Sequence, residues 1–185
     1  KIYKNIKFKN KLLKKFKIED LKKYKKLKGV FGIGENLTRQ KIFLEMKKIN
    51  KKFKWQKIIS KNSIISKNAI IGDGTFVAPG CIINNNTKIG YNCLVNTGSI
   101  IEHDSEMKDF ASIGPGVTTG GNVIINKLSY IGIASVIKHN IEIEENVIIG
   151  ANSYVNKNCK KNKVYFGNPA RFQRDKLLKE SQFGK

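Results

Sequence analysis

The stretch that decides the fold begins with Ile58-Ile59-Ser60-Lys61-Asn62-Ser63 and repeats this six-residue pattern without insertion to Cys159. The second position is apolar in every one of the seventeen hexads except one, which has Thr119. The sixth position is mostly small. Neither the 3.6-residue period of a helix nor the two-residue alternation of a strand produces this register. A short fixed period predicts a mainly β protein, a solenoid in which each coil buries the same positions against the next coil.

The register also assigns roles to cysteine and glycine. Cys81, Cys93 and Cys159 all occupy the small sixth position, which indicates packing residues rather than a disulfide, a nucleophile or metal ligands. The sequence contains no Cys-x-x-Cys pair, so a zinc site is not expected. Glycine recurs at the third position, where we expect a turn that requires positive φ. These residues are Gly72, Gly90, Gly114, Gly120, Gly132 and Gly150.

Residues 1–57 are predicted to form a small α/β domain in front of the solenoid, which occupies residues 58–171. We expect a buried strand at 30–34, a helix to about residue 50 capped by Asn36 or Thr38, and an extended segment at 54–59. A short helix is expected to begin at residues 18–21. Because no Gly-rich strand–helix turn precedes the basic segment, the first βα element of the domain is expected to be missing.

The end of the chain departs from the repeat. Residues 164–171 break the hexad register and should leave the stack of coils. Residues 172–185 are expected to form a polar tail with a helical part around 175–179.

The charge is uneven along the chain. Residues 1–61 carry 22 basic and 4 acidic side chains, out of a net charge of +22 for the whole chain. This favours an acidic partner, such as a pyrophosphate-bearing substrate, an anionic membrane or a nucleic acid. The alternative is the lysine bias of an AT-rich genome. Specific nucleic-acid recognition is disfavoured because the chain has 33 Lys and only 3 Arg.

Two features bear on localisation. No stretch approaches the roughly 18 consecutive apolar residues of a membrane span. The first residues do not resemble a signal peptide. We therefore expect a cytoplasmic protein without a transmembrane segment.

One hexad, residues 100–105, differs from the others by placing His103 between Glu102 and Asp104. A carboxylate beside an imidazole orients the ring and increases its basicity, as a general base near neutral pH requires. The alternative is an exposed turn histidine. The only other histidine, His139, follows 36 residues later at the same position. With three hexads per coil it is expected two coils away, about 9–10 Å at strand spacing, which does not suit a shared metal ion.

Two neighbouring segments are expected on the same face as His103. One contains Asn96 and Thr97. The other is the glycine pair of Gly120 and Gly121, whose backbone N–H groups could line a cofactor or hold an oxyanion. A purely structural turn is the alternative for the glycine pair.

Several segments together match the pattern of a known family: 32–39, 96–104, 109–117, 120–123 and 167–171. They resemble the hexapeptide-repeat sugar acyltransferases, and most of all the NeuD/PglD-like sialic acid and UDP-amino-sugar acetyltransferases. The resemblance implies a left-handed parallel β-helix of triangular cross-section, assembled as a homotrimer with acetyl-CoA bound between neighbouring prisms.

The resemblance also implies roles for individual residues. His103 is the general base, Asp104 raises its basicity, and Asn96 helps to position the sugar. Gly34 matches a position at the nucleotide-sugar site. Four positions are implied at the cofactor: Ser112, which stands where the family commonly has a second histidine, Gly121, Ile133 and Ala151.

The resulting hypothesis is acetyl transfer from acetyl-CoA to a sugar, without a metal. N-acetylation of a UDP-linked amino sugar is favoured, because a Lys-rich N-terminal domain suits a pyrophosphate. O-acetylation of sialic acid or a related sugar is the alternative. A non-catalytic assembly solenoid and a binder of anionic surfaces or nucleic acid remain as further hypotheses.

Overall fold

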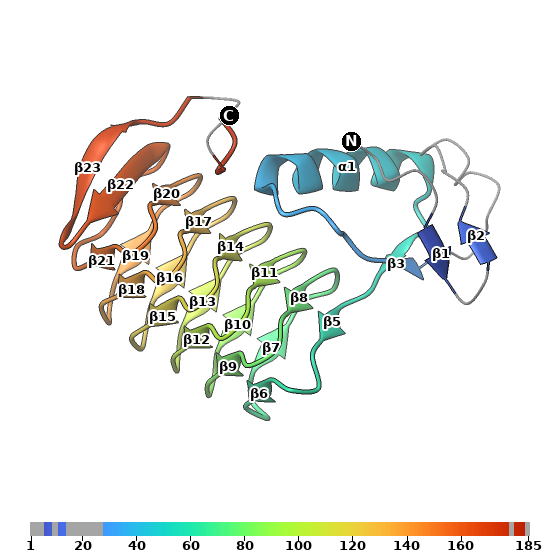
Figure 1. Ribbon diagram of the computed structural model, residues 1–185, viewed down its shortest axis with the longest axis horizontal. Helices are drawn as coiled ribbons and strands as arrows, with labels where there is room; N and C mark the ends of the chain where they lie inside the picture. The colour runs from blue at the N-terminus through green and yellow to red at the C-terminus, as the bar shows by residue number, and fades with distance from the viewer. Residues whose placement is uncertain (1–5, 9–10, 14–27, 178–179, 184–185) are drawn as a thin grey trace.

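The protein is described here by a computed structural model that covers residues 6–8, 11–13, 28–177 and 180–183 (Figure 1). The helix expected at 18–21 lies outside these residues. Within them, β1 (Ile6–Phe8) and β2 (Lys11–Leu13) form an antiparallel pair. Among the described residues, no helix has the length and apolarity that crossing a membrane requires.

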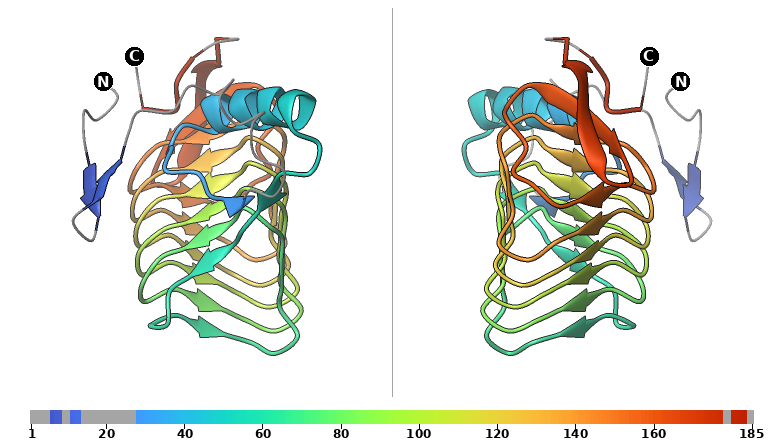
Figure 2. Two further views of the ribbon diagram at one scale, coloured as in Figure 1. Left: turned by 90° about the vertical axis from the view of Figure 1, so that its right-hand side faces the viewer. Right: turned by 90° about the vertical axis from the view of Figure 1, so that its left-hand side faces the viewer.

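The hexads form a parallel β-solenoid, which confirms the expected fold class. A two-residue strand occupies the first two positions of each hexad, and three hexads make one coil. Strands in successive coils therefore pair eighteen residues apart, as Leu94 does with Ser112. Figure 2 shows the coils stacked one above another.

Three sheets run along the solenoid. Sheet 1 consists of β5 (Ile58–Ile59), β8 (Phe76–Val77), β11 (Leu94–Val95), β14 (Ser112–Ile113), β17 (Tyr130–Ile131), β20 (Ile148–Ile149), β22 (Lys163–Gly167) and β23 (Ala170–Asp175). Sheet 2 consists of β6 (Ile64–Ile65), β9 (Ile82–Ile83), β12 (Ile100–Ile101), β15 (Thr118–Thr119), β18 (Val136–Ile137) and β21 (Tyr154–Val155). Sheet 3 consists of β7 (Ile70–Ile71), β10 (Lys88–Ile89), β13 (Glu106–Met107), β16 (Ile124–Ile125) and β19 (Glu142–Ile143).

Turn residues at the third to sixth positions connect these sheets and form three corners. Corner 1–2 joins sheet 1 to sheet 2, corner 2–3 joins sheet 2 to sheet 3, and corner 3–1 completes the coil. Residues 96–99 thus lie on corner 1–2, residues 102–105 on corner 2–3, and residues 108–111 on corner 3–1.

The core is the stack of second-position side chains, which are almost fully buried from Val77 to Val155. Small sixth-position residues tie the coils together as well as packing. The Ser135 hydroxyl donates to the Gly150 carbonyl at 2.9 Å and accepts from the Ser153 N–H at 3.2 Å. The hydroxyl thus links the corner to two backbone groups of the next coil.

The three cysteines follow the same rule and are free and buried, as expected. The Cys81 thiol lies 3.0 Å from the Asn96 carbonyl, to which it donates. Burial raises the pKa of Cys93 and of Cys159 to about 12. These thiols are therefore protonated at neutral pH, which fits a packing role.

The role expected for third-position glycines is wrong. Positive φ occurs instead at the fifth position, for example at Asn86 (57°), Asp104 (58°) and Asn122 (55°). The third-position glycines allow coils to approach, since a Cβ at Gly72 would lie 2.6 Å from the Gly90 carbonyl oxygen. Close approach of the coils falls on the third position and positive φ on the fifth, because the backbone reverses two residues after the point of closest approach.

In front of the solenoid, β3 (Lys28–Gly29), α1 (Asn36–Ile49) and β4 (Lys54–Trp55) follow the expected strand–helix–strand order. The strands pair in parallel. The strand expected at 30–34 is wrong, because β3 ends at Gly29 and the next residues form a loop. That loop follows the outer face of sheet 1 rather than joining a ladder.

The N-cap of α1 is Glu35, not Asn36 or Thr38. Its carboxylate accepts from the N–H groups of Leu37 at 3.1 Å and Thr38 at 2.6 Å. Asn36 is unavailable for capping because its side-chain amide donates to the carbonyls of Leu128 and Ser129 on corner 3–1. The helix lies along the solenoid on this corner (Figures 1 and 2).

The C-terminal segment does not leave the stack at once. β22 continues sheet 1 by pairing in parallel with β20, Ile148 opposite Val164, before β23 folds back antiparallel. The helical part expected from residue 175 is wrong at its start, because Asp175 is the last residue of β23. The chain then returns to α1, where the Gln182 side chain accepts from the Asn36 N–H and donates to the Gly34 carbonyl.

Candidate active site

His103 lies on corner 2–3 beside Asp104, as the sequence predicts. Its Nδ1 is 2.8 Å from Oδ2 of Asp104, and both side chains are more than half exposed. The positive φ of Asp104 turns its side chain back toward the preceding residue. A carboxylate at Nδ1 favours the tautomer with the proton on that nitrogen, which leaves Nε2 to accept a proton.

Asp104 is itself held in place. Its Oδ1 accepts from the side-chain amide of Asn86 at 3.1 Å. The hydrogen bond from His103, and then that from Asn86, lower the pKa of the Asp104 carboxyl below its usual value. Asp104 therefore stays ionised at and below neutral pH, the state in which it can stabilise an imidazolium.

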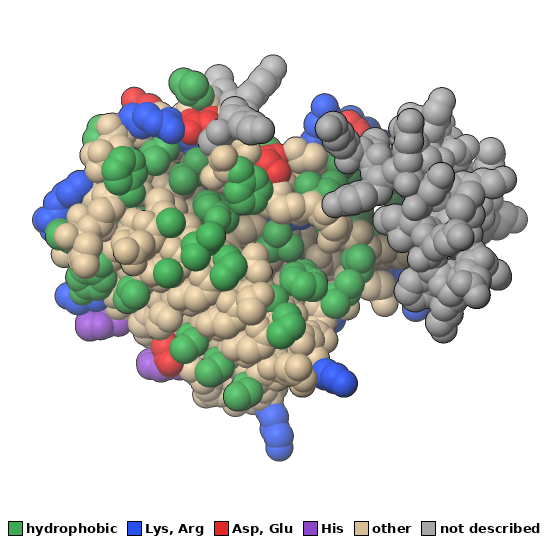
Figure 3. All heavy atoms as spheres, viewed as in Figure 1, with side chains coloured by type: hydrophobic (Ala, Val, Ile, Leu, Met, Phe, Trp, Pro, Cys, Tyr) green, Lys and Arg blue, Asp and Glu red, His purple; other side chains and the backbone are tan. Residues whose placement is uncertain are grey.

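Gly121 lies in the next coil directly against the imidazole. A Cβ added at Gly121 would lie 2.6 Å from Cε1 and 2.7 Å from Nε2 of His103. His139 follows one coil further, and the two histidines, purple in Figure 3, lie at one edge of the molecule. The described part of the chain contains no group of three His, Cys, Asp or Glu side chains that could hold a metal ion.

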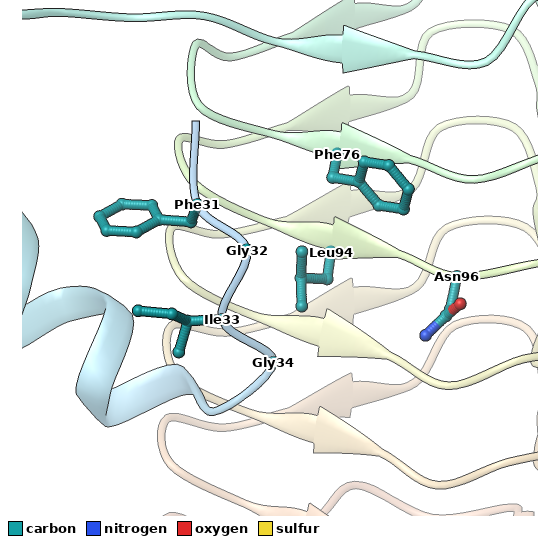
Figure 4. Close-up of a pocket in the computed structure, with 7 residues that line it drawn as sticks. All are labelled: Phe31, Gly32, Ile33, Gly34, Phe76, Leu94 and Asn96. Atoms are coloured by element: carbon teal, nitrogen blue, oxygen red, sulfur yellow. The ribbon is translucent and has the colours of Figure 1, made fainter. Parts of the chain in front are cut away.

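A cleft on the outer face of sheet 1 brings together the two predicted sugar-binding residues, Gly34 and Asn96. It has a volume of about 240 Å³, and the loop of residues 31–34 and the side chains of Phe76 and Leu94 complete its lining. Figure 4 shows the side chains of Phe31 and Ile33 pointing away from Asn96, so the loop presents its glycine backbone to the cleft.

The loop is anchored by Arg39, which is fully buried in the first half of α1. Its guanidinium donates to the carbonyls of Gly34 at 2.6 Å and Ile33 at 3.2 Å on one side. On the other side it donates to the carbonyls of Asn92 at 3.2 Å and Phe110 at 3.1 Å on corner 3–1. Burial lowers the pKa of Arg39 to about 10, so the group remains charged at neutral pH.

Ser112 belongs to this anchor. Its hydroxyl accepts from Arg39 at 2.8 Å and donates to the Asn36 side chain at 2.6 Å, and the residue is buried. The resemblance implied that Ser112 contacts the cofactor, but its hydroxyl is bonded to Arg39 and Asn36. Ser112 also lies far along the coil from corner 2–3. A cofactor contact of Ser112 stays a prediction.

Sequence reasoning left Arg39 without a role. The available signal was its identity, since it is one of 3 arginines in a chain with 33 lysines. A planar guanidinium with five donors suits a site with several fixed acceptors, which lysine does not.

The remaining cofactor-site predictions, Ile133 and Ala151, lie in successive coils on corner 1–2. A Cβ at Gly132 would lie 2.5 Å from the Ala151 nitrogen, and Ile133 is half exposed. The residues that follow them, Ala134 and Asn152, line a hollow together with Asn168 of the C-terminal hairpin.

The structure places six of the eight predicted residues on two corners; Gly34 lies on the loop before α1 and Ser112 at the start of β14. His103, Asp104 and Gly121 lie on corner 2–3, whereas Asn96, Ile133 and Ala151 lie on corner 1–2. The expectation that Asn96 shares a face with His103 is wrong within one chain. Their separation of seven residues in sequence spans one full strand of sheet 2, β12, which puts them at its opposite ends.

The sequence matches no protein-family model and no curated protein. Solved structures match well. GDP-perosamine N-acetyltransferase from Caulobacter crescentus has a TM-score of 0.81 at 23% identity, over 85% of this chain and 74% of that chain.

Two further matches are slightly closer in sequence. The acetyltransferase domain of PglB from Neisseria gonorrhoeae has a TM-score of 0.75 at 25% identity, over 78% of this chain and 69% of that chain. WeeI from Acinetobacter baumannii has a TM-score of 0.75 at 26% identity, over 81% and 72%. The PglB domain has also been solved with acetyl coenzyme A. These likenesses support a CoA-dependent acyltransferase as the enzyme class of this chain.

Proposed function

We propose that this chain N-acetylates a nucleotide-linked amino sugar with acetyl-CoA, using His103 as the general base. The observation that carries the proposal is the contact of 2.8 Å between Nδ1 of His103 and Asp104, with Gly121 directly against the ring. The cleft between Gly34 and Asn96 supports a sugar acceptor. PerB from Caulobacter crescentus, which has a similar structure, was solved with CoA and GDP-perosamine. This supports a nucleotide-linked amino sugar as the substrate.

The residues supply the following chemistry. Nε2 of His103 takes a proton from the amine as its nitrogen forms a bond to the thioester carbonyl carbon. Asp104 stabilises the imidazolium. The N–H groups of Gly120 and Asn122 donate to the carbonyls of Ile137 and His103. The oxyanion is therefore assigned to the N–H of Gly121 itself while the carbon–sulfur bond breaks, and His103 returns the proton to the departing thiolate.

A homotrimer would unite the two groups of residues. The outer face of sheet 2 presents Ile64, Ile82, Ile100, Val136 and Tyr154, and Ile64 and Val136 are 68% and 45% exposed. Sheet 3, in contrast, mixes charged and apolar side chains on its outer face: Ile70, Lys88, Glu106, Ile124 and Glu142. An uncovered apolar face suits a second copy of the chain. Corners 1–2 and 2–3 flank it, so packing on sheet 2 would bring corner 2–3 of one protomer near corner 1–2 of its neighbour.

The test is release of thiol from acetyl-CoA with UDP-, GDP- and dTDP-linked amino sugars and with sialic acid. We expect turnover with an amino sugar, and His103→Gln should reduce kcat by about 10²–10⁴ while leaving CoA affinity unchanged. The matched control His139→Gln, two coils away, should keep full activity.

The outcomes separate the hypotheses. Turnover with sialic acid alone would establish the O-acetylation alternative. Full activity of the His103 variant would show that the base is another group. If calorimetry detects no CoA binding at millimolar concentration, the proposed acetyltransferase activity is overturned and a non-catalytic assembly role is favoured.

A further inference from the structure

The one polar residue among the inward-facing second positions, Thr119, lies in the coil directly after the His103 hexad. It is 1% exposed, and its hydroxyl accepts the backbone N–H of Glu102 at 3.0 Å. Glu102 immediately precedes His103. The exception to the apolar stack therefore holds the backbone of the residue next to the proposed base.

The hydroxyl takes the place of a backbone carbonyl in the ladder. In neighbouring coils the equivalent N–H donates to the carbonyl of the second-position residue, as Asn84 does to Ile101 at 2.9 Å and Gly120 to Ile137 at 2.7 Å. Among the described solenoid strands, β12 and β15 are paired at one position, Ile100 with Thr118, whereas every other parallel pair has two. The ladder of backbone hydrogen bonds is thus interrupted just before His103.

The position of Glu102 determines the position of the imidazole. Its carbonyl accepts from the Thr87 hydroxyl at 3.2 Å, so threonines of two coils hold its backbone from both sides. The ring that follows has two contacts: Gly121 lies against one edge, and Asp104 binds Nδ1. A shift of Glu102 by a fraction of an ångström would therefore change both contacts of His103.

We propose that Thr119 is a positioning residue that sets the placement of His103 through the N–H of Glu102. The proposal rests on the proposed function only in that His103 is taken as the base. Folding alone does not favour threonine here. Valine has the same shape, would complete the apolar stack, and would leave the N–H free to return to the backbone carbonyl of residue 119.

The experiment compares Thr119→Val, Thr119→Ser and Thr119→Ala with the wild-type chain. All are made in a His139→Gln background, where His103 supplies the only imidazole signals in the NMR spectrum. We expect Thr119→Val and Thr119→Ala to shift the ring signals. Thr119→Val should also reduce kcat by about 10- to 100-fold without raising KM for acetyl-CoA. Thr119→Ser, which keeps the hydroxyl, should retain both properties.

Thr75→Val is the matched control. Thr75 also has a buried hydroxyl, which donates to the Gly90 carbonyl at 2.8 Å and accepts from the Cys93 N–H at 3.0 Å, but on corner 3–1. We expect this variant to lower Tm and leave the ring signals unchanged, whereas Thr119→Val should not lower Tm. Stability is then expected to depend on Thr75, and activity on Thr119.

Two results would overturn the proposal: wild-type ring signals in Thr119→Val or Thr119→Ala, or altered signals in Thr119→Ser. The NMR readout does not depend on turnover. Shifted ring signals in a chain whose wild type transfers no acetyl group would support the positioning and contradict only the proposed function.

Discussion

At the scale of single residues, the proposed site depends on the absence of a side chain at Gly121. The φ of Gly121 lies outside the left-handed region, so alanine is compatible with the backbone. The contact with His103 is what excludes it, because a Cβ would lie 2.6 Å from the ring.

Gly121→Ala should therefore displace the imidazole and reduce kcat by about 10²-fold, since misplacement by about an ångström has that effect. Tm should change little. Steady-state kinetics and a thermal melt measure these quantities. Wild-type kcat in this variant would show that the ring has room to move without loss of function.

At the scale of elements, α1 is joined to the solenoid by the side chain of Asn36 and by the buried guanidinium of Arg39. Arg39 connects the loop of Gly34 with Asn92 and Phe110, residues that are 53 and 71 positions away in sequence. The helix thus holds both the solenoid corner and one wall of the cleft.

Arg39→Met should lower the free energy of unfolding by about 3 kcal/mol, because several buried carbonyls lose their donor. It should also raise KM for the sugar and leave KM for acetyl-CoA unchanged. Denaturant titration and steady-state kinetics give these values. Arg171→Met, at an exposed arginine, is the control and should stay within about 0.5 kcal/mol of wild type. Equal effects of the two variants would contradict the anchor.

At the scale of the whole molecule, the two groups of site residues lie at opposite ends of the strands of sheet 2. A single chain therefore leaves His103 apart from Asn96, Ile133 and Ala151. Because the apolar outer face of sheet 2 lies between them, the proposed activity depends on assembly through that face.

Val136→Lys should convert a trimer to monomers and abolish acetyl transfer, because a buried unpaired lysine is costly at an interface. Light scattering after size exclusion measures the mass. Leu44→Lys is the control, since Leu44 is 51% exposed on α1, away from sheet 2. A monomeric wild type that is fully active would exclude the proposed assembly.

Much of this molecule was predictable from local pattern. The hexad register predicted the solenoid and the packing role of the cysteines. The residues around His103 predicted its pairing with Asp104, and the resemblance implied the three-sided coil. The expected N-cap and the strand at 30–34 were wrong, because contacts with the solenoid determine both. Asn36 is used on corner 3–1, and the loop follows sheet 1.

What the sequence by itself determined is the repeat and the one hexad with an oriented histidine, since both depend on residues close together in the chain. The tertiary structure decided which residues share a corner, why Arg39 is an arginine and what Thr119 contacts. These depend on groups 17 to 76 residues apart, such as Glu102 with Thr119 and Asn36 with Ser112. A local pattern cannot assign such contacts, because the stacking of coils creates them.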